Sequence, residues 1–395
     1  MRDLNRTVAE LMARGKGVLA ADESIATMSS RLADAGVAPT GDNRRDYREM
    51  LVTTPGLSQG VSGVILCDET FRQRVSGGAT FPGALADAGI LAGIKVDSGA
   101  KPLAGQPGEK VTEGLDGLRD RLAAYAALGA SFAKWRAVID IGDGRPSWRA
   151  LRANAHALAR YAALCQEAGV VPIVEPEVLM DGAHTLDRCA RATVATLMAV
   201  FAELQDVGVR LDAIVLKPNM VVPGAKSAEL ATPDEVARAT LSALHTIVPE
   251  ETGGVAFLSG GQPPERATAN LAAIRALPTP WPVTFSFGRA LVDPALAAWR
   301  GEPDRAWAGQ RALAQRVAAC SGALTGAAAA AAGDVLTIPA PRPVNGGTDR
   351  PGAKLRLAPV RAKLPFLKTS GAANGARAWR HAHAAAARQR RDHGR

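Results

Sequence analysis

The sequence lacks any run of about 18 consecutive apolar residues, the length that a membrane-spanning helix requires. Its first residues, MRDLNRTVAELMARGKG, mix charged and apolar side chains and so differ from the continuous apolar segment of a signal peptide. Cysteine is scarce, with four residues in 395 and no CxxC pair, which excludes a scaffold held together by disulfides. We therefore expect a cytoplasmic protein with no membrane partner.

Histidine is also scarce, and its spacing gives little support to a metal-dependent mechanism. Only His156, His184 and His245 precede the last 62 residues, and they lie far apart with no HxxxH pattern and no nearby cysteine cluster. We expect no metal site and no cofactor.

The positive charge is concentrated at one end of the chain. Residues 334–395 contain 13 of the 47 basic residues and only 3 of the 38 acidic ones, whereas the preceding 333 residues are almost balanced. The segment mixes Pro, Gly, Ala and Arg without a usable period, so we expect a disordered, low-complexity tail. Nucleic-acid binding is not expected, apart from a nonspecific contact through the arginines of this tail.

Residues 1–333 alternate short apolar runs with helical stretches, and we expect them to form one domain. Eight runs have the composition of buried strands: 17–22, 63–67, 93–97, 132–138, 171–178, 213–220, 254–261 and 283–290. The stretch 232–248 begins with Thr-Pro-Asp-Glu, a favourable helix start. Eight strands alternating with helices are typical of a (β/α)₈ TIM barrel.

A doubly wound open sheet is the rival architecture. Its dinucleotide signature places GxGxxG between the first strand and its helix, whereas the first strand here ends in ADES. We therefore predict the barrel.

Several predicted strands carry ionisable residues near their C-terminal ends, where TIM-barrel active sites lie. These residues are Asp22, Lys95, Asp97, Lys134, Arg136, Glu175, Glu177, Lys217 and Arg289. A lone buried charge costs several kcal/mol. One buried pair could be purely structural, but so many charges on separate strands indicate a functional site.

Lys217 follows the apolar run IVL, and Lys134 is the natural neighbouring cation. Burial and a like charge both lower the proton affinity of a lysine, and a neutral amine can attack a carbonyl to form a Schiff base. Glu175 and Glu177 lie on the same face of their strand and could shuttle the protons that this chemistry requires.

The last two predicted strands lead into SGG, at residues 259–261, and into GRA, at residues 288–290. Loops after strands 7 and 8 commonly bind phosphate in this fold, because backbone N–H groups at glycine can approach the anion. Arg289 could add a bidentate contact. The expected substrate carries both a carbonyl and a phosphate.

In these segments and others the sequence resembles the class I (Schiff-base) fructose-1,6-bisphosphate aldolases. The matching segments occur in order over about residues 3–320, and they are GKGVLAADES, GVILCDET, GIKVDSG, PLAG, GLDGL, FAKWR, PIVEPE, VLKPNMVVPG, FLSGGQ and FSFGRAL. FAKWR, EPE, KPNM and LSGGQ together are highly specific.

The resemblance implies roles for the matching residues. Lys217 is implied as the Schiff-base lysine, Glu175 as the proton-transfer group with Glu177 beside it, and Asp22 as the acceptor of the C4 hydroxyl proton. Lys134 is implied to tune Lys217. The implied substrate-binding and phosphate-binding residues are Lys95, Arg136, Ser259, Gly260, Gly261, Ser286, Gly288 and Arg289, with Arg31, Arg44, Ser24 and Thr27 at the second phosphate.

The family also implies a reaction and an assembly. Fructose 1,6-bisphosphate is cleaved reversibly to dihydroxyacetone phosphate and glyceraldehyde 3-phosphate, in glycolysis and gluconeogenesis. An iminium serves as the electron sink, so no metal is required. The implied assembly is a homotetramer.

Four features depart from the family pattern. Ala26 replaces a glycine, Asp68 a histidine and Ser98 a lysine, and residues 334–395 contain no tyrosine, although family members commonly have one in a C-terminal tail that folds over the site. The last departure leaves enamine protonation to another group or to water.

Two other functions stay open on the sequence alone. One is a related Schiff-base lyase that prefers fructose 1-phosphate or sedoheptulose bisphosphate. The other is an idle barrel that acts as a binding module through its basic tail.

Overall fold

The structure is a computed structural model and describes residues 3–326. The predicted domain boundary at residue 333 and the whole basic tail, residues 334–395, lie outside the described residues.

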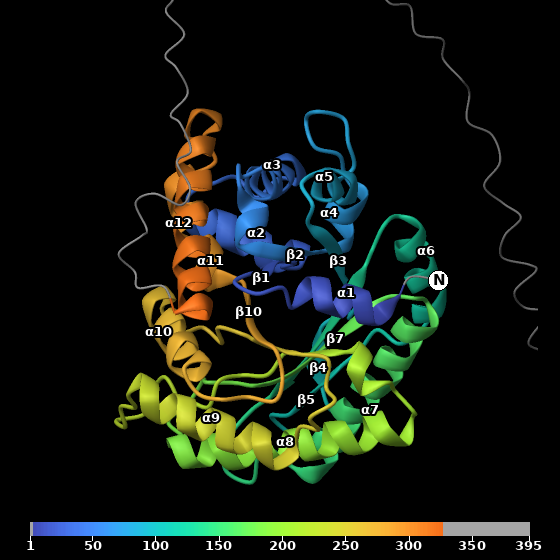
Figure 1. The fold of residues 1–395 in the computed structure, drawn as a ribbon, viewed down its shortest axis with the longest axis vertical. Coiled ribbons are helices and arrows are strands. Elements are labelled where there is room, and N and C mark those ends of the chain that lie inside the picture. The colour runs from blue at the N-terminus through green and yellow to red at the C-terminus, as the bar shows by residue number, and fades with distance from the viewer. Residues whose placement is uncertain (1–2, 327–395) are drawn as a thin grey trace, which may run out of the picture. The chain divides into compact units, whose positions relative to one another are not determined.

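Eight parallel strands close into a barrel, as the sequence predicts (Figure 1). Around the barrel the strands follow the order β1, β10, β9, β8, β7, β6, β3, β2. Their bounds are β1 Gly17–Ala21, β2 Val61–Leu66, β3 Leu91–Lys95, β6 Phe132–Ile139, β7 Val171–Val178, β8 Val215–Leu216, β9 Val255–Phe257 and β10 Val283–Phe287. The (β/α)₈ architecture is confirmed.

The predicted strands overlap these eight, but β8, β9 and β10 end three or four residues earlier than predicted. The amide of Lys217 still donates to Val174 O at 2.7 Å, yet the next residue is Pro218, which has no amide hydrogen to continue the ladder. The side chain of Asn219 donates through Nδ2 to the Thr193 hydroxyl at 3.1 Å. Backbone pairing with β7 therefore stops after Lys217, although the Pro218 carbonyl still accepts from the Leu258 amide at 3.1 Å on the other side.

Alternation along β6 separates the barrel interior from its outer shell. Phe132, Lys134 and Arg136 point inward, whereas Trp135 points outward, where its ring lies 5.6 Å from that of Tyr161. The interior thus changes from apolar to charged within two residues of one strand.

Helix α1 (Leu4–Leu11) closes the apolar end of the barrel (Figure 1). Its residues Leu4, Val8 and Leu11 belong to one buried cluster with strand residues that include Phe132. The bulk of Phe132 requires glycine opposite, because a Cβ on Gly93 would lie 2.2 Å from the Phe132 ring.

The predicted helical stretch 232–248 is one of the helices that surround the barrel. They are α2 Ile25–Asp34, α3 Gly41–Val52, α4 Asp68–Arg72, α5 Phe81–Asp87, α6 Leu118–Ala127, α7 Trp148–Glu167, α8 Leu186–Asp206, α9 Pro233–Ile247, α10 Pro264–Arg275, α11 Arg289–Trp299 and α12 Ala306–Thr325. Short 3₁₀ turns lie at Leu57–Gln59, Leu211–Ala213 and Pro303–Arg305. As its sequence predicts, α9 starts with a capping box between Thr232 and Glu235.

One element was not predicted. Strands β4 (Ala100–Pro102) and β5 (Lys110–Thr112) form a separate antiparallel pair after β3. The residues that lead into β4 border the site described next.

Candidate active site

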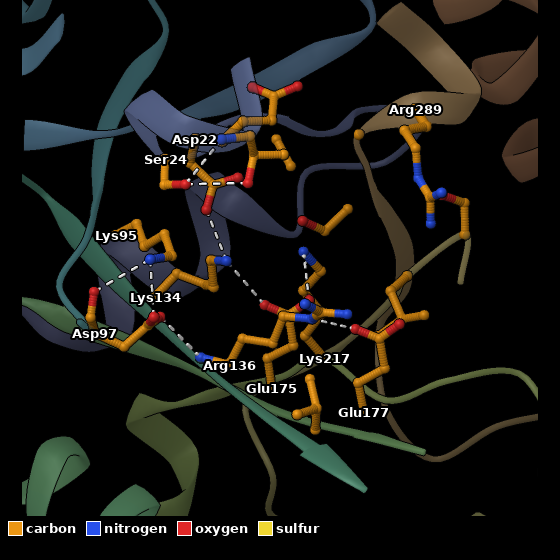
Figure 2. Close-up of a pocket in the computed structure, with 18 of the residues that line it drawn as sticks. Asp22, Ser24, Lys95, Asp97, Lys134, Arg136, Glu175, Glu177, Lys217 and Arg289 are labelled. Carbon is orange, nitrogen blue, oxygen red and sulfur yellow. Dashed lines mark hydrogen bonds and ion pairs between the residues drawn. The ribbon is translucent and has the colours of Figure 1, made fainter. Parts of the chain in front are cut away.

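A pocket of about 730 Å³ lies at the C-terminal ends of the barrel strands (Figure 2). The structure brings together there all but one of the residues predicted for the site, namely Asp22, Ser24, Thr27, Arg31, Lys95, Lys134, Arg136, Glu175, Glu177, Lys217, Ser259, Gly260, Gly261, Ser286, Gly288 and Arg289. Residues from seven of the eight strands or the loops after them therefore converge on one cavity, as expected of this fold.

Lys217 lies at the end of β8 and is deeply buried. Its Nζ is 3.1 Å from Oε1 of Glu175, which projects from the adjacent strand β7, and both side chains are only 4% exposed. Such a buried amine is held by one carboxylate and shielded from bulk water.

The same glutamate also contacts a second lysine. Nζ of Lys134, on β6, is 3.2 Å from Oε2 of Glu175 and 2.6 Å from Oδ2 of Asp22. Figure 2 shows Lys134 between the two carboxylates. Two lysines thus share Glu175, and the predicted proximity of a second cation to Lys217 is present in the geometry.

Charge compensation fixes the ionisation of this cluster. Burial alone would disfavour the ammonium of Lys134, but Asp22 and Glu175 outweigh it and raise the pKa of Lys134 above its usual range. Burial would raise the pKa of Asp22 and of Glu175, yet the lysines outweigh it and lower both. Both carboxylates are therefore ionised and can accept protons at neutral pH.

Two more ion pairs surround this cluster. Arg136 contacts Glu177 through Nε, and Lys95 Nζ lies 2.8 Å from Oδ1 of Asp97. Glu177 is thus bound to arginine, whereas Glu175 faces the amine of Lys217. The two glutamates predicted as proton shuttles therefore have different environments.

The loops after β9 and β10 form a cradle with the features of an anion site. Gly260 and Gly261 adopt positive φ values of 59° and 81°, which glycine adopts without strain. Arg289 is the first residue of α11, rather than part of the preceding strand as predicted, and a Cβ on Gly261 would lie 3.0 Å from its Nη2. The Ser286 hydroxyl is buried there, and no hydrogen-bond partner is found for it within residues 3–326. A helix N-terminus, glycine amides and a guanidinium suit a phosphate.

A second polar group lies beyond Asp22. The Ser24 hydroxyl caps α2 by accepting from the Thr27 amide at 3.2 Å, and it lies 3.0 Å from the Thr27 hydroxyl. Arg31, also on α2, contacts Glu23 and pairs with Asp293 of α11 at 2.6 Å. Hydroxyls and a paired arginine, rather than a free cation, form this end of the pocket.

Arg44 is the predicted site residue that does not line the pocket. Its guanidinium makes two hydrogen bonds to Glu69, at 2.6 and 2.9 Å, and donates to the Ser29 hydroxyl at 3.1 Å. Glu69 was not considered from the sequence. It accepts hydrogen bonds from Arg44 Nε and Nη2, which a phosphate would need as donors.

Sequence reasoning missed two acidic residues that line the pocket, Glu23 and Asp293. Glu23 directly follows Asp22, and Asp293 lies four residues after Arg289 on the same helix, hence on the same helical face. Had the start of α11 been predicted at Arg289, the four-residue spacing would have indicated that Asp293 lies on the same side of the helix.

The departures from the family pattern have different surroundings. Ser98 lines the pocket, whereas Asp68 accepts a hydrogen bond from the Tyr125 hydroxyl at 2.6 Å. Neither Tyr125 nor the other two tyrosines of the chain, Tyr47 and Tyr161, line the pocket.

Residues 3–326 contain no group of three or more His, Cys, Asp or Glu side chains suited to hold a metal ion. Over the same residues, no helix is long and apolar enough to cross a membrane.

Comparisons with known proteins agree with this geometry. A family model described as fructose-bisphosphate aldolase class-I matches residues 3–336. A Xanthomonas campestris pv. campestris protein named "Probable fructose-bisphosphate aldolase class 1" is 52% identical over 300 residues, which cover 76% of this chain and 90% of the relative. The fructose-bisphosphate aldolase of Drosophila melanogaster is 49% identical over 327 residues, covering 82% and 90%.

Among solved structures, fructose-bisphosphate aldolase from Plasmodium falciparum, crystallised with TRAP and a small-molecule inhibitor, superposes with a TM-score of 0.80. It is 42% identical, and the match covers 82% of this chain and 94% of that one. The family model, the two relatives and this structure all lead to the same conclusion: the chain belongs to the class I fructose-bisphosphate aldolase family.

Proposed function

We propose that the chain cleaves fructose 1,6-bisphosphate reversibly into dihydroxyacetone phosphate and glyceraldehyde 3-phosphate through a Schiff base on Lys217. The observation that carries this proposal is the buried Lys217 amine, 3.1 Å from Glu175 and beside a second lysine that binds the same carboxylate. Family membership supports the reaction class.

In the first step the Lys217 amine gives up a proton to Glu175 and attacks the C2 ketone, which forms a carbinolamine. Protonation of the carbinolamine hydroxyl, with Glu175 as the acid, lets water leave and produces the iminium. The buried setting excludes bulk water and favours this dehydration.

Carbon–carbon cleavage then uses Asp22 as the base. Its carboxylate takes the proton of the C4 hydroxyl, the C3–C4 bond breaks, and the electron pair moves into the iminium to form an enamine. Glyceraldehyde 3-phosphate leaves. Protonation of the enamine carbon and hydrolysis of the resulting iminium release dihydroxyacetone phosphate and restore Lys217.

The positions of the two basic groups orient the substrate. Lys217 acts on C2, next to the C1 phosphate, for which the cradle of Gly260, Gly261 and Arg289 is the suitable site. Asp22 acts on C4 and lies two residues before Ser24, so the C6 phosphate extends toward Ser24, Thr27 and Arg31. We propose that Lys95 and Arg136, at the edge of the central cluster, bind substrate oxygens.

The proposal is tested by borohydride trapping. Reduction in the presence of dihydroxyacetone phosphate should inactivate the enzyme irreversibly and add one three-carbon phosphate adduct to Lys217, as mapped by peptide mass spectrometry. A Lys217→Met variant should show no adduct and lose at least about 10⁴-fold in kcat. EDTA should leave cleavage unchanged. An adduct on another lysine, or full activity in the variant, would overturn the assignment.

We further propose that the enzyme works as a homotetramer in the cytoplasm without a cofactor, and that residues 1–333 form the catalytic domain. The nearly balanced charge of residues 1–333 supports a sugar phosphate rather than a nucleic acid as the partner. Light scattering after size exclusion tests the assembly, and a chain truncated after Gly333 should retain cleavage activity. Salt-sensitive nucleic-acid binding through residues 334–395, together with absent cleavage, would favour the binding-module alternative.

A further inference from the structure

The two proposed phosphate ends of the pocket differ in available positive charge. Arg289 is the only cation lining this pocket, among the described residues, for which no ion pair or side-chain hydrogen bond is found. Arg31, at the opposite end, already contacts two carboxylates, Glu23 through Nη1 and Asp293 through Nη2.

The contacts of Arg31 belong to a longer chain of alternating charges. Asp293 pairs with Arg31, Arg31 with Glu23, and Glu23 with the fully buried Arg48, whose Nη2 lies 3.0 Å from Oε2 of Glu23. Two guanidinium groups and two carboxylates cancel, so the cluster offers an incoming dianion no net positive charge. Glu23 also lines the pocket, but its carboxylate is bound by Arg48 as well as by Arg31, whereas Arg31 is the one ion-pair partner found for Asp293 within residues 3–326.

Asp293 is the accessible member of that pair. Its side chain is 51% exposed, compared with 15% for Arg31. A phosphate at Arg31 must therefore displace Asp293 or share the guanidinium with it, and two anions on one cation repel each other.

We propose that Asp293 is a specificity-determining residue whose carboxylate competes with the C6 phosphate for Arg31 and thereby reduces the preference for bisphosphates over C1 monophosphates. This inference rests on the proposed function. It goes further by assigning a role to an acidic residue of α11 that does not touch the reacting atoms.

The test compares fructose 1,6-bisphosphate with fructose 1-phosphate in the full chain. We expect Asp293→Asn to raise the ratio of kcat/KM for the bisphosphate to kcat/KM for the monophosphate about fivefold, the size expected for a half-exposed charge. The gain should come from a lower KM for the bisphosphate, with kcat for the monophosphate unchanged.

Two further variants separate competition from a general effect. Asp34→Asn removes the same charge from an exposed residue that borders the same surface groove as Arg31 and Asp293, but no ion pair is found for Asp34 within the described residues, so the ratio should stay at the wild-type value. Asp293→Glu keeps the charge and should restore a low ratio. A purely structural role would instead lower kcat for both substrates together.

Three outcomes overturn the inference: an unchanged ratio in Asp293→Asn, a fall in that ratio, which would mean that Asp293 positions Arg31 for the phosphate, or an equal rise in Asp34→Asn. Failure of the proposed function looks different, because the wild-type enzyme would then not cleave fructose 1,6-bisphosphate.

Discussion

The two ends of the barrel interior are built from the same strands but have opposite chemistry. At the end closed by α1, side chains such as Phe132 and Ile173 form an apolar cluster with Leu11. Two residues further along the same strands, Lys134 and Glu175 form a network of buried ion pairs.

The contrast shows how one fold divides stability from function. The apolar end gains free energy by burial, whereas the charged end gains little, because desolvation offsets the attraction within a buried ion pair. Changes at the apolar end should therefore affect the free energy of unfolding, and changes at the charged end should affect catalysis as well.

The largest expected effect on stability is at the apolar end. Phe132→Ala removes a fully buried ring that packs directly against Gly93 and Gly63. Because these glycines have no side chains to fill the space, a cavity should remain and the free energy of unfolding should fall by about 3–5 kcal/mol. Urea titration measures this loss, and kcat of the folded fraction should change far less. A loss below about 1 kcal/mol would contradict the view of α1 and Phe132 as a packed plug.

The next largest effect is expected at the charged end. Lys134→Met removes the ion-pair partner of buried Asp22 and one of the two ion-pair partners of buried Glu175, so the free energy of unfolding at pH 7 should fall by about 2–4 kcal/mol. Cleavage activity should fall too, which distinguishes this variant from Phe132→Ala. Denaturation and kcat are measured on the same preparations.

The pH dependence of that variant has a definite sign. Asp22 and Glu175 have pKa values lowered from 3.8 and 4.5, so their stabilising contribution is present above those values and is lost as pH falls through the lowered ones. Lys134 has a raised pKa, so its contribution persists until alkaline pH. The stability difference between wild type and Lys134→Met should therefore shrink in acid, below about pH 4. A difference constant down to pH 2 would contradict the assigned charges.

The smallest effect is expected from a residue outside both ends. Thr232→Ala removes the hydroxyl that caps α9 and should cost about 1 kcal/mol in unfolding free energy. Because Thr232 does not line the pocket, kcat/KM for fructose 1,6-bisphosphate should stay within error. A clear loss of activity would contradict this expectation and show that the N-terminal cap of α9 affects the active site.

Much of the fold was predictable because its signals are local. Apolar runs such as 171–178 match β7, and Thr-Pro-Asp-Glu matches the start of α9. The convergence of Asp22, Glu175 and Lys217 followed from topology alone, because parallel strands bring their carboxyl ends to one mouth.

The ion-pair partners were not predictable, because they depend on side chains that meet only in the folded chain. Arg44 was expected at a phosphate, but Glu69, 25 residues away in the sequence, binds its guanidinium. Asp293 and Arg31 are 262 residues apart and carry no shared motif. The β4–β5 pair was missed because its six residues have no distinctive apolar alternation.

The position of Glu175 between two lysines has a consequence for the proposed cycle. The nitrogen of Lys217 lies 3.1 Å from Oε1 of Glu175 and becomes positive in the proposed iminium, so a carboxylate already lies where the positive charge develops. The nitrogen is neutral in the attacking amine and the carbinolamine and becomes neutral again in the enamine, where Glu175 loses one of its two cations. The fixed charges around this nitrogen therefore stabilise its cationic forms relative to the neutral enamine. This difference favours protonation of the enamine.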